Sequence, residues 1–348
     1  MNIILSSIGA LKNPKESARI TLFLMATELQ RQGHDVRIMA KGKRSETIER
    51  IMVHRTSLIT IPLLLHRLHK EKKIDIIHSF SASPLFLLPH LLAPGKKIHT
   101  MKSYSRSKIG MWGAFLVKLA NTVTVPTKVH AKKWGIEKYE IVHSPINTAK
   151  FKPLDKNDMK KRYGYEKQKI ILYYGALWKN KGVDNLLRAM PEIIEREKNV
   201  LLLILPRYAK IKPQQELVNQ LKIENNVRFI TEDVAIEEYV NLADMVALPY
   251  LNLIGTEGNP SCMLEAMASK TKVVTTDLAE LREIGEGSVL FAKPSDPKSL
   301  AETILAMLSL GEPETNQMLE KAYEKSQEFD RKKIAQQFFG LYNSLLEK

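Results

Sequence analysis

The stretch IILYYGALWKNKGVDNLLRAMPEIIEREKNVLLLIL, residues 170–205, decides the fold. Residues 170–174 and 200–205 are continuous apolar runs of strand length, and residues 183–195 carry apolar side chains at helical spacing. A strand, a helix and a second strand in this order predict a right-handed crossover between two parallel strands. The stretch therefore indicates an α/β protein built on a parallel sheet.

The rest of the chain repeats this alternation. Further strands are predicted at residues 2–7, 35–40, 75–79, 98–101, 122–125, 227–230, 245–248 and 272–276. Further helices are predicted at residues 18–31, 61–72, 85–92, 111–120, 127–134, 214–221, 236–243 and 261–269, and nearly throughout 297–348. The helix at 61–72 is expected to turn Leu63, Leu64, Leu65 and Leu68 inward.

A break at residues 145–158 divides the two series of strands and helices. It contains Pro, Asn and Asp without periodicity, which is typical of a linker. A chain of 348 residues is also longer than one domain usually is. We therefore predict two open parallel α/β domains, residues 1–150 and 151–330, followed by helix. Ligands of such sheets bind at the carboxyl ends of the strands, and here also in the cleft between the domains.

Composition excludes several other classes of protein. With 44% hydrophobic and 26% charged residues the chain is expected to fold rather than to be disordered. Its single cysteine, Cys262, excludes a disulfide scaffold and suits a reducing compartment. No apolar run approaches the roughly 20 residues of a membrane helix, and the N-terminus is expected to be a strand rather than a signal peptide. We therefore expect a cytoplasmic protein.

The positive charge is confined to the first half of the sequence. Residues 1–150 carry 25 Lys and Arg against 9 Asp and Glu, whereas residues 151–348 carry 28 against 29. A local excess of this size attracts anionic partners such as phospholipid headgroups, phosphorylated acceptors or nucleic acid. The alternative is a solvated basic face without a partner.

The segment TEGNPSCMLEAMA, residues 256–268, is the candidate binding site. Asn259 suits a helix N-cap and Pro260 the first helical position, which would leave three free amides pointing toward the cleft. Those amides, of Ser261, Cys262 and Met263, and the helix dipole would form an anion site suited to a diphosphate. Gly258 allows close backbone approach, and Glu257 and Glu265 could accept hydrogen bonds from sugar hydroxyls. The alternative is a capped helix with two surface glutamates.

The segment and its surroundings closely resemble the family 4 retaining glycosyltransferases of GT-B fold, which carry a Glu-x7-Glu motif. In the second half the similarity includes YGAL (174–177), KGV (181–183), VRF (227–229), AD (243–244), LP (248–249), VVTTD (273–277) and DP (296–297). In the first half it includes QGHDV (32–36), DIIH (75–78) and FKP (151–153). The resemblance implies two Rossmann-like domains facing a cleft, with C-terminal helices.

The resemblance also implies roles for the two domains. The first would bind the acceptor and the second a nucleotide-sugar, and the helix at residues 331–346 would pack back on the first. Glu265 would hold the ribose hydroxyls, Glu257 a hydroxyl of the donor sugar, and Lys181 the diphosphate, with Gly175 also at the donor site. Without the resemblance, Lys181 would be a surface lysine at a helix start, where the helix dipole disfavours a positive charge.

Several family positions are changed in this chain. A glycine pair is replaced by Ser17-Ala18, a phosphate-binding arginine by Ala176, a histidine by Lys102, Gly-x-Gly by Leu205-Pro206-Arg207, and Gly-Gly by Ala279-Glu280. Each missing cationic partner of the phosphates costs about 1.5–3 kcal/mol if nothing replaces it. We expect Arg207 or Lys102 to compensate for the missing arginine.

The implied reaction moves a hexosyl group from a nucleotide diphosphate to an acceptor hydroxyl with retention of configuration. Catalysis would consist of positioning and of stabilising the charge that develops on the diphosphate. The sequence contains no Asp and His cluster with metal-ligand spacing, so we expect no metal and no cofactor besides the donor. The alternative is a catalytically impaired GT-B module that binds or regulates an active enzyme, motivated by the changed positions.

The basic residues of the first half suggest where the acceptor comes from. Lys102, Arg106 and Lys108 precede Trp112 and Phe115, and a second basic group follows residues 61–65. Basic side chains beside aromatic ones suggest docking at the anionic inner face of a membrane, with a lipid or lipid-linked glycan as acceptor. An ordinary core-facing stripe is the alternative for Trp112 and Phe115. No zinc spacing or ribonucleoprotein motif supports nucleic-acid binding.

Overall fold

The computed structural model describes residues 1–7, 17–81, 84–102, 115–208, 210–256 and 258–347. The chain divides into two compact units. Unit 1 consists of residues 1–146, 254–259 and 329–348, and unit 2 of residues 147–253 and 260–328. The backbone therefore passes between the units four times, and the segment 254–259 belongs to unit 1 although both its sequence neighbours belong to unit 2.

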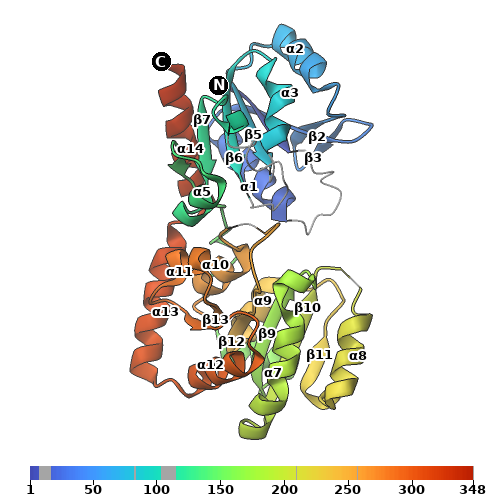
Figure 1. Ribbon diagram of the computed structural model, residues 1–348, viewed down its shortest axis with the longest axis vertical. Helices are drawn as coiled ribbons and strands as arrows, with labels where there is room; N and C mark the ends of the chain where they lie inside the picture. Colours follow the sequence, from blue (N-terminus) through green and yellow to red (C-terminus); the bar gives the residue numbers. More distant parts are fainter. Residues whose placement is uncertain (8–16, 82–83, 103–114, 209, 257, 348) are drawn as a thin grey trace. The chain divides into compact units, whose positions relative to one another are not determined.

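Unit 1 is built on a sheet whose described strands lie in the order β3-β4-β2-β1-β5-β6-β7-β8 (Figure 1). All neighbours are parallel except β3 and β4. The strands are β1 (Asn2–Ser7), β2 (Asp35–Lys41), β3 (Glu46–Ile48), β4 (Ile51–Thr56), β5 (Ile76–Ser81), β6 (Lys96–Met101), β7 (Thr122–Val125) and β8 (Glu140–Ile141). The parallel core of this sheet confirms the predicted architecture.

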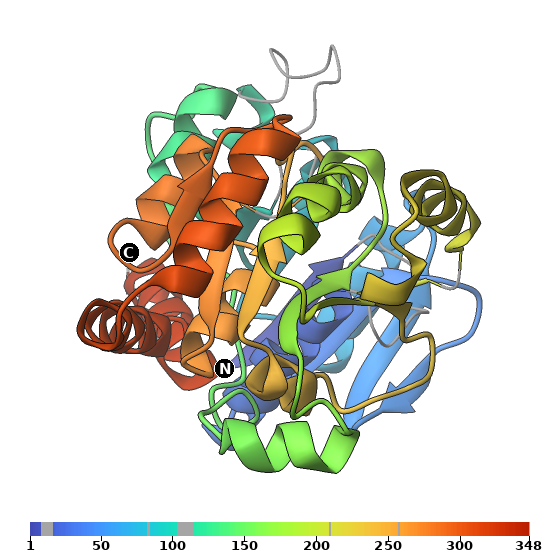
Figure 2. The same cartoon turned by 90° about the horizontal axis from the view of Figure 1, so that it is seen from below.

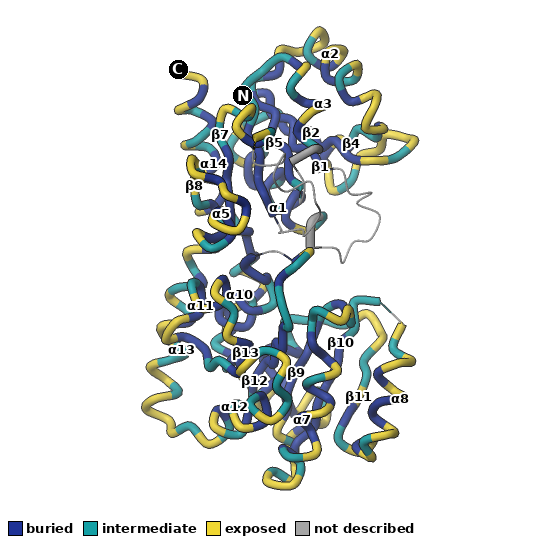
Figure 3. Tube along the Cα trace, in the orientation of Figure 1, coloured by how far each residue is buried: buried dark blue, intermediate teal, exposed yellow. Residues whose placement is uncertain are grey.

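Helices cover both faces of the unit 1 sheet. The helices are α1 (Ser17–Arg31), α2 (Ile61–Glu71), the 3-10 turn η1 (Pro84–Leu87), α3 (Leu88–Leu91), α5 (Lys128–Trp134) and α14 (Arg331–Leu346). Helices α1 and α14 share one apolar core with the strands, and α2 packs on a separate core across the sheet. The central strands β1 and β5 are buried while α2 turns much of its surface outward (Figure 3). Leu65 and Leu68 point inward as predicted, but Leu63 is 73% exposed, so its predicted burial is wrong.

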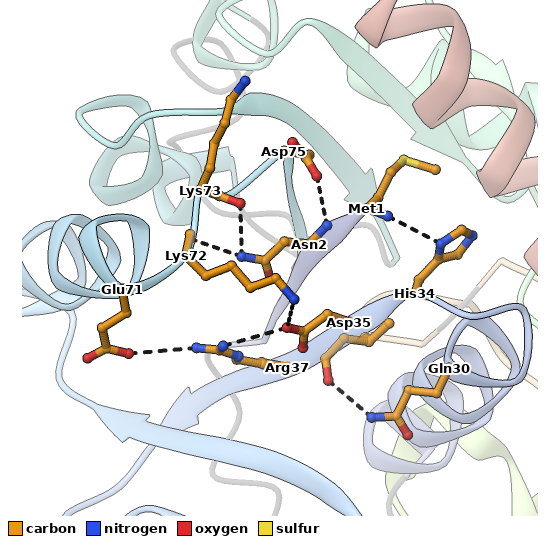
Figure 4. Close-up of polar contacts among 11 residues, drawn as sticks. Met1, Asn2, Gln30, His34, Asp35, Arg37, Glu71, Lys72, Lys73 and Asp75 are labelled. Atoms are coloured by element: carbon orange, nitrogen blue, oxygen red, sulfur yellow. Dashed lines mark hydrogen bonds and ion pairs between the residues drawn. The ribbon is translucent and has the colours of Figure 1, made fainter.

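Polar contacts fasten together the amino ends of three neighbouring strands of unit 1 (Figure 4). The Asn2 side-chain amide donates to the carbonyl oxygens of Lys72 and Lys73, each at 3.0 Å, and the Asn2 backbone N–H donates to Asp75 Oδ2 at 2.8 Å. Lys72 Nζ forms an ion pair with Asp35 Oδ2 at 2.7 Å. These contacts lie at the sheet edge opposite the carboxyl ends of the strands. They also pair Lys72, one of the basic residues of the first half of the sequence, with a carboxylate.

Unit 2 contains a second, fully parallel sheet in the order β11-β10-β9-β12-β13-β14 among its described strands. The strands are β9 (Lys169–Gly175), β10 (Val200–Pro206), β11 (Val227–Phe229), β12 (Met245–Leu248), β13 (Lys272–Thr276) and β14 (Leu290–Ala292). This strand order places the carboxyl ends of β9, β10 and β12 next to one another. Ligands of parallel sheets bind at that edge.

The helices of unit 2 cover both faces of its sheet. They are α6 (Lys156–Tyr163), the 3-10 turn η2 (Lys179–Lys181), α7 (Val183–Arg196), α8 (Lys212–Leu221), the 3-10 turn η3 (Glu224–Asn226), α9 (Ile236–Leu242), α10 (Ser261–Ala268), α11 (Ala279–Gly285), α12 (Pro297–Ser309) and α13 (Glu312–Gln327). Helices α7 and α12 lie side by side over one face and share the main core (Figure 2). Helices α9 and α10 contact the sheet outside that core, and α13 packs on α10.

The predicted linker ends earlier than residue 158, because α6 already begins at Lys156. The Asp155 carboxylate caps α6 by accepting a hydrogen bond from the Asp158 backbone N–H at 2.8 Å. Ahead of it, the Asn241 side chain accepts from the Leu154 N–H at 2.8 Å and donates to the Lys152 carbonyl at 3.1 Å. The segment before α6 is therefore fastened to α9 although it lacks regular structure.

Candidate functional site

The candidate site begins where α10 starts, at the carboxyl side of the unit 2 sheet. Pro260, with φ −59° and ψ 125°, occupies the N-cap position, and Ser261 is the first helical residue. The expectation that Asn259 caps this helix is therefore wrong by one residue. The Met263 N–H donates to the Pro260 carbonyl at 3.1 Å, so the predicted free amide of Met263 is also wrong. Ser261 and Cys262 supply the first-turn amides that the helix itself does not use.

Asn259 has a different role, inside unit 1. It is fully buried, and its side-chain amide donates to the Ser144 carbonyl at 3.4 Å. A Cβ atom on Gly258 would lie 3.1 Å from Pro126 Cγ and 3.2 Å from His130 Nδ1, so this glycine packs closely on the start of α5. Both predicted donor-binding residues therefore help to seat the segment 254–259 on unit 1.

Glu265 is held by a tyrosine from the neighbouring strand. The Tyr174 hydroxyl, at the end of β9, lies 3.1 Å from Glu265 Oε2 and 2.8 Å from the Cys262 carbonyl oxygen. Although Glu265 keeps some exposed surface, desolvation raises its pKa to about 7, while the Tyr174 hydrogen bond and the positive charges of Arg207 and Lys150 act in the opposite direction. The carboxylate is therefore poised to change charge near neutral pH unless a ligand stabilises it.

The charges of two cations act on Cys262 in the first turn of α10. Burial raises the pKa of the Cys262 thiol, and the charges of Lys181 and Arg207 partly oppose this rise. Arg207 follows β10, and its backbone N–H donates to the Gly175 carbonyl at 2.8 Å. Lys181 Nζ lies 4.8 Å from the centre of the Tyr250 ring. Arg207 thus supplies positive charge beside Ala176, the position at which the resemblance led us to expect an arginine.

The loop that carries Lys181 has a fixed backbone. Gly182 has φ +73°, and a Cβ atom there would lie 1.7 Å from the Pro249 carbonyl oxygen. The Leu251 N–H donates to the Asn180 carbonyl at 2.9 Å. Only glycine fits this close approach between the loop after β9 and the loop after β12. Gly175 also has a positive φ, of 141°, where β9 turns into the loop.

The tyrosines of this site were missed by the sequence reasoning. Tyr173, Tyr174 and Tyr250 are all buried, and burial raises the pKa of each well above its usual value, so all three remain neutral phenols. The Tyr173 hydroxyl donates to the Ala176 carbonyl at 2.5 Å. The available signal was the pair Tyr173-Tyr174 directly before Gly175, because polar-tipped aromatics at a strand end need hydrogen-bond partners.

In unit 1 the structure describes two residues of the predicted basic and aromatic surface, Lys102 and Phe115. Lys102 is 8% exposed and its Nζ lies 5.4 Å from the centre of the Phe80 ring, so the expectation that it meets an acceptor or membrane at the surface is wrong. Phe115, by contrast, is 62% exposed, which contradicts a core-facing role for that residue. Arg106, Lys108 and Trp112 lie outside the described residues, as does Glu257.

Two features are absent from the part of the chain that the structure describes. Within it, no three side chains of His, Cys, Asp or Glu come together in a way that could hold a metal ion. Within the same residues, no helix is long and apolar enough to cross a membrane.

Residues 155–325, from the start of α6 to near the end of α13, match the family model described as Glycosyl transferases group 1. Among curated proteins, an uncharacterized glycosyltransferase of Methanocaldococcus jannaschii is 29% identical over 52% of this chain and 46% of its own length. A D-inositol 3-phosphate glycosyltransferase of Corynebacterium urealyticum is 31% identical over 51% of this chain and 43% of its own length. The chain thus spans about half the length of the curated relatives it matches.

Solved structures match over the whole chain. A glycosyltransferase from Rickettsia africae has a TM-score of 0.84 at 18% identity, covering 100% of this chain and 99% of that one. The Anabaena protein HepE in complex with UDP has a TM-score of 0.83 at 15% identity, covering 99% and 100%. At these identities the likeness establishes the fold, which is GT-B with C-terminal helices, as predicted.

Proposed function

We propose that this chain is a retaining hexosyltransferase that moves a sugar from a nucleotide diphosphate to an acceptor hydroxyl. The observation that carries the proposal is that the charges of Glu265, Lys181 and Arg207 all act on Cys262, in the first turn of α10. This arrangement joins a carboxylate that can accept sugar hydroxyls to two cations and helix amides that can bind a diphosphate. The match of residues 155–325 to group 1 glycosyl transferases supports the same assignment.

In the proposed complex the donor lies on unit 2. Glu265 accepts hydrogen bonds from the ribose hydroxyls, and the amides of Ser261 and Cys262 face the diphosphate. Lys181 and Arg207 neutralise the phosphates, and Arg207 takes the role of the arginine whose position Ala176 occupies. Glu257 accepts a hydrogen bond from a hydroxyl of the transferred sugar. HepE binds UDP within the same fold, which makes a uridine donor the first to test.

The proposed chemistry proceeds on one face of the sugar. The bond between the anomeric carbon and the leaving diphosphate oxygen breaks, and a bond to the acceptor oxygen forms on the same face. The acceptor proton passes to the departing phosphate oxygen, so atoms and charge balance. Lys181, Arg207 and the α10 amides stabilise the negative charge that develops there, which is the largest contribution this site can make. The residues assigned here require no metal.

The acceptor is proposed to bind unit 1 at an anionic membrane surface. A small and almost wholly apolar pocket, too small to hold a sugar, lies at the carboxyl ends of β1, β2 and β4 and is lined in part by Ser6, Ser7, Lys41, Thr56, Ser57 and Leu58. Next to it Ile59 is 89% and Leu63 73% exposed, and the exposed side chains of Arg67 and Lys70 follow Leu63 along the same face of α2. Exposed apolar and basic side chains together favour an anionic lipid surface.

Donor transfer is tested with purified protein and UDP-, GDP-, ADP- and dTDP-sugars. The proposal expects one donor to be hydrolysed or transferred, with a product whose anomeric configuration by NMR equals that of the donor. Glu257→Ala and Lys181→Ala should each reduce turnover at least about 100-fold. Donor binding without turnover would support the impaired binding module instead, and an inverted product would overturn retention.

Membrane docking is tested by co-sedimentation with vesicles of phosphatidylcholine alone or with phosphatidylglycerol. The wild type should sediment with the anionic vesicles only, and Ile59→Asp with Leu63→Asp should abolish this. Leu346→Asp is the control, because Leu346 is an exposed apolar residue on α14. Equal sedimentation with both vesicles, or no effect of the double substitution, would exclude this surface.

A further inference from the structure

Tyr174 stands out among the buried titratable groups because its single hydroxyl hydrogen lies between two acceptors. The residue is 5% exposed on β9, and its Oη is 2.8 Å from the Cys262 carbonyl oxygen and 3.1 Å from Glu265 Oε2. A phenol donates one hydrogen, so the two acceptors share it. The hydroxyl therefore joins the first turn of α10 to the carboxylate one turn further on.

The Tyr174 hydroxyl acts on the Glu265 carboxyl group, whose other neighbours act in opposite directions on its charged form. Arg207, after β10, and Lys150, before α6, favour the charged form, whereas Glu237 on α9 disfavours it. Desolvation disfavours it most. Tyr174 is the hydrogen-bond donor from the sheet, and because its backbone is part of β9 its hydroxyl has little freedom to move away.

We propose that Tyr174 is a positioning residue for donor binding, which holds the Glu265 carboxylate in the orientation that accepts the ribose hydroxyls. The inference rests on the proposed function and adds to it a residue on β9 that touches no reacting atom. It also gives a role to one of the two tyrosines that follow the aliphatic residues 170–172 in β9.

The proposal predicts a specific dependence of nucleotide affinity on pH. The ionised carboxylate accepts both ribose hydroxyls, whereas the protonated form loses acceptor capacity. Because the pKa of Glu265 is raised to about 7, affinity for a ribonucleotide should fall about tenfold between pH 8 and pH 6. Removing the Tyr174 hydroxyl removes a hydrogen bond that lowers this pKa, so the fall should occur at higher pH.

The experiment is calorimetric titration of the full chain with UDP and its 2′,3′-dideoxy analogue between pH 6 and pH 9. GDP and ADP with their analogues replace this pair if they bind more tightly. The analogue carries the same diphosphate, so the difference between the two ligands isolates the ribose hydroxyls from the titration of phosphate. In Tyr174→Phe the ribose-dependent affinity at pH 8 should fall at least about fivefold and recover partly at pH 9.

Two variants serve as references. Tyr173→Phe removes a neighbouring buried hydroxyl that donates to the Ala176 carbonyl instead, so it should keep the wild-type pH profile. Glu265→Gln should bind with no ribose-dependent pH profile at all. This second comparison tests the carboxylate even if Tyr174→Phe does not fold.

The outcomes distinguish a failure of the proposed function from a failure of the positioning role of Tyr174. If the wild type binds none of the nucleotides at any pH, the proposed function fails and the role of Tyr174 fails with it. If the wild type binds but Tyr174→Phe keeps its profile, only the positioning role is overturned. If Glu265→Gln keeps the ribose-dependent profile, the assignment of the ribose hydroxyls to Glu265 fails, and the positioning role fails with it.

Discussion

Gly182→Ala tests the backbone geometry that places Lys181. The substituted residue would have to keep φ at +73°, and its Cβ would lie 1.7 Å from the Pro249 carbonyl oxygen and 2.8 Å from the carbonyl carbon. Real Cβ atoms essentially never come within 3.0 Å of a heavy atom outside their own residue and its chain neighbours, so one of the two backbone segments must move by about 1 Å or more. Neither partner is a flexible side chain, and the clash therefore cannot be relieved by a rotamer change.

The cost can be built from three contributions, namely backbone strain, a weakened hydrogen bond and weakened packing. An alanine in the left-handed region costs about 1 kcal/mol or slightly more. Moving the loop also weakens the hydrogen bond from the Leu251 N–H to the Asn180 carbonyl, which contributes about 1 kcal/mol. Because packing between the two loops is weakened as well, Gly182→Ala should lower the free energy of unfolding by about 3 kcal/mol.

Gly164→Ala provides a matched control in the same unit. Gly164 also has φ +73°, but no heavy atom lies within 4 Å of its ideal Cβ, so this variant reports the backbone strain alone, about 1 kcal/mol. Urea unfolding measures both variants, and titration with a nucleoside diphosphate follows binding. Gly182→Ala should also bind the nucleotide at least about tenfold more weakly, because Lys181 moves with the loop. Equal destabilisation by the two substitutions would refute the reasoning.

Three further predictions concern stability. Burial lowers the pKa of His90 to about 4, below its usual 6.5, so the free energy of unfolding that His90 contributes above pH 6.5 is lost as pH falls. At pH 5 this loss is about 2 kcal/mol. In urea unfolding, His90→Gln should remove this pH dependence. Tyr342→Phe removes a hydroxyl 2.7 Å from His78 Nδ1 and should lower the unfolding free energy by about 1–2 kcal/mol, measured by thermal unfolding. Asn241→Ala breaks the bond to the Leu154 N–H and two others, and should cost about 2–3 kcal/mol in urea unfolding.

The sequence predicted the parallel strands because each is a short apolar run between helices, and this pattern depends on local residues. It missed the hairpin of β3 and β4, which adds two strands to the edge of the unit 1 sheet. Its two-residue turn consists of Glu49 and Arg50, with φ of 52° and 67°. Such turns are normally recognised by Asn-Gly or Asp-Gly. Here two residues without that signature take the left-handed conformation, so the turn has no local signal in the sequence.

Lys102 and Asn259 show why local rules failed at individual residues. The charge of Lys102 predicts exposure, but its position after β6 brings it against Phe80 from β5, where the ring faces the ammonium group. Asn259 has the residue type of an N-cap, yet its side chain bonds Ser144, 115 residues earlier in the chain. Both outcomes depend on contacts between distant segments, which residue preferences do not contain.

The position of Asn259 also changes how the Glu-x7-Glu segment should be understood. The pattern is continuous in sequence, but residues 254–259 belong to unit 1 and the helix that follows belongs to unit 2. Gly258 packs on α5 and Asn259 bonds Ser144, so the first part of the motif has its own anchors within unit 1. Glu265 depends on Tyr174 within unit 2. Substitutions at Gly258 and at Tyr174 should therefore act through different units, the first through the packing of unit 1 and the second through the pH dependence of nucleotide affinity.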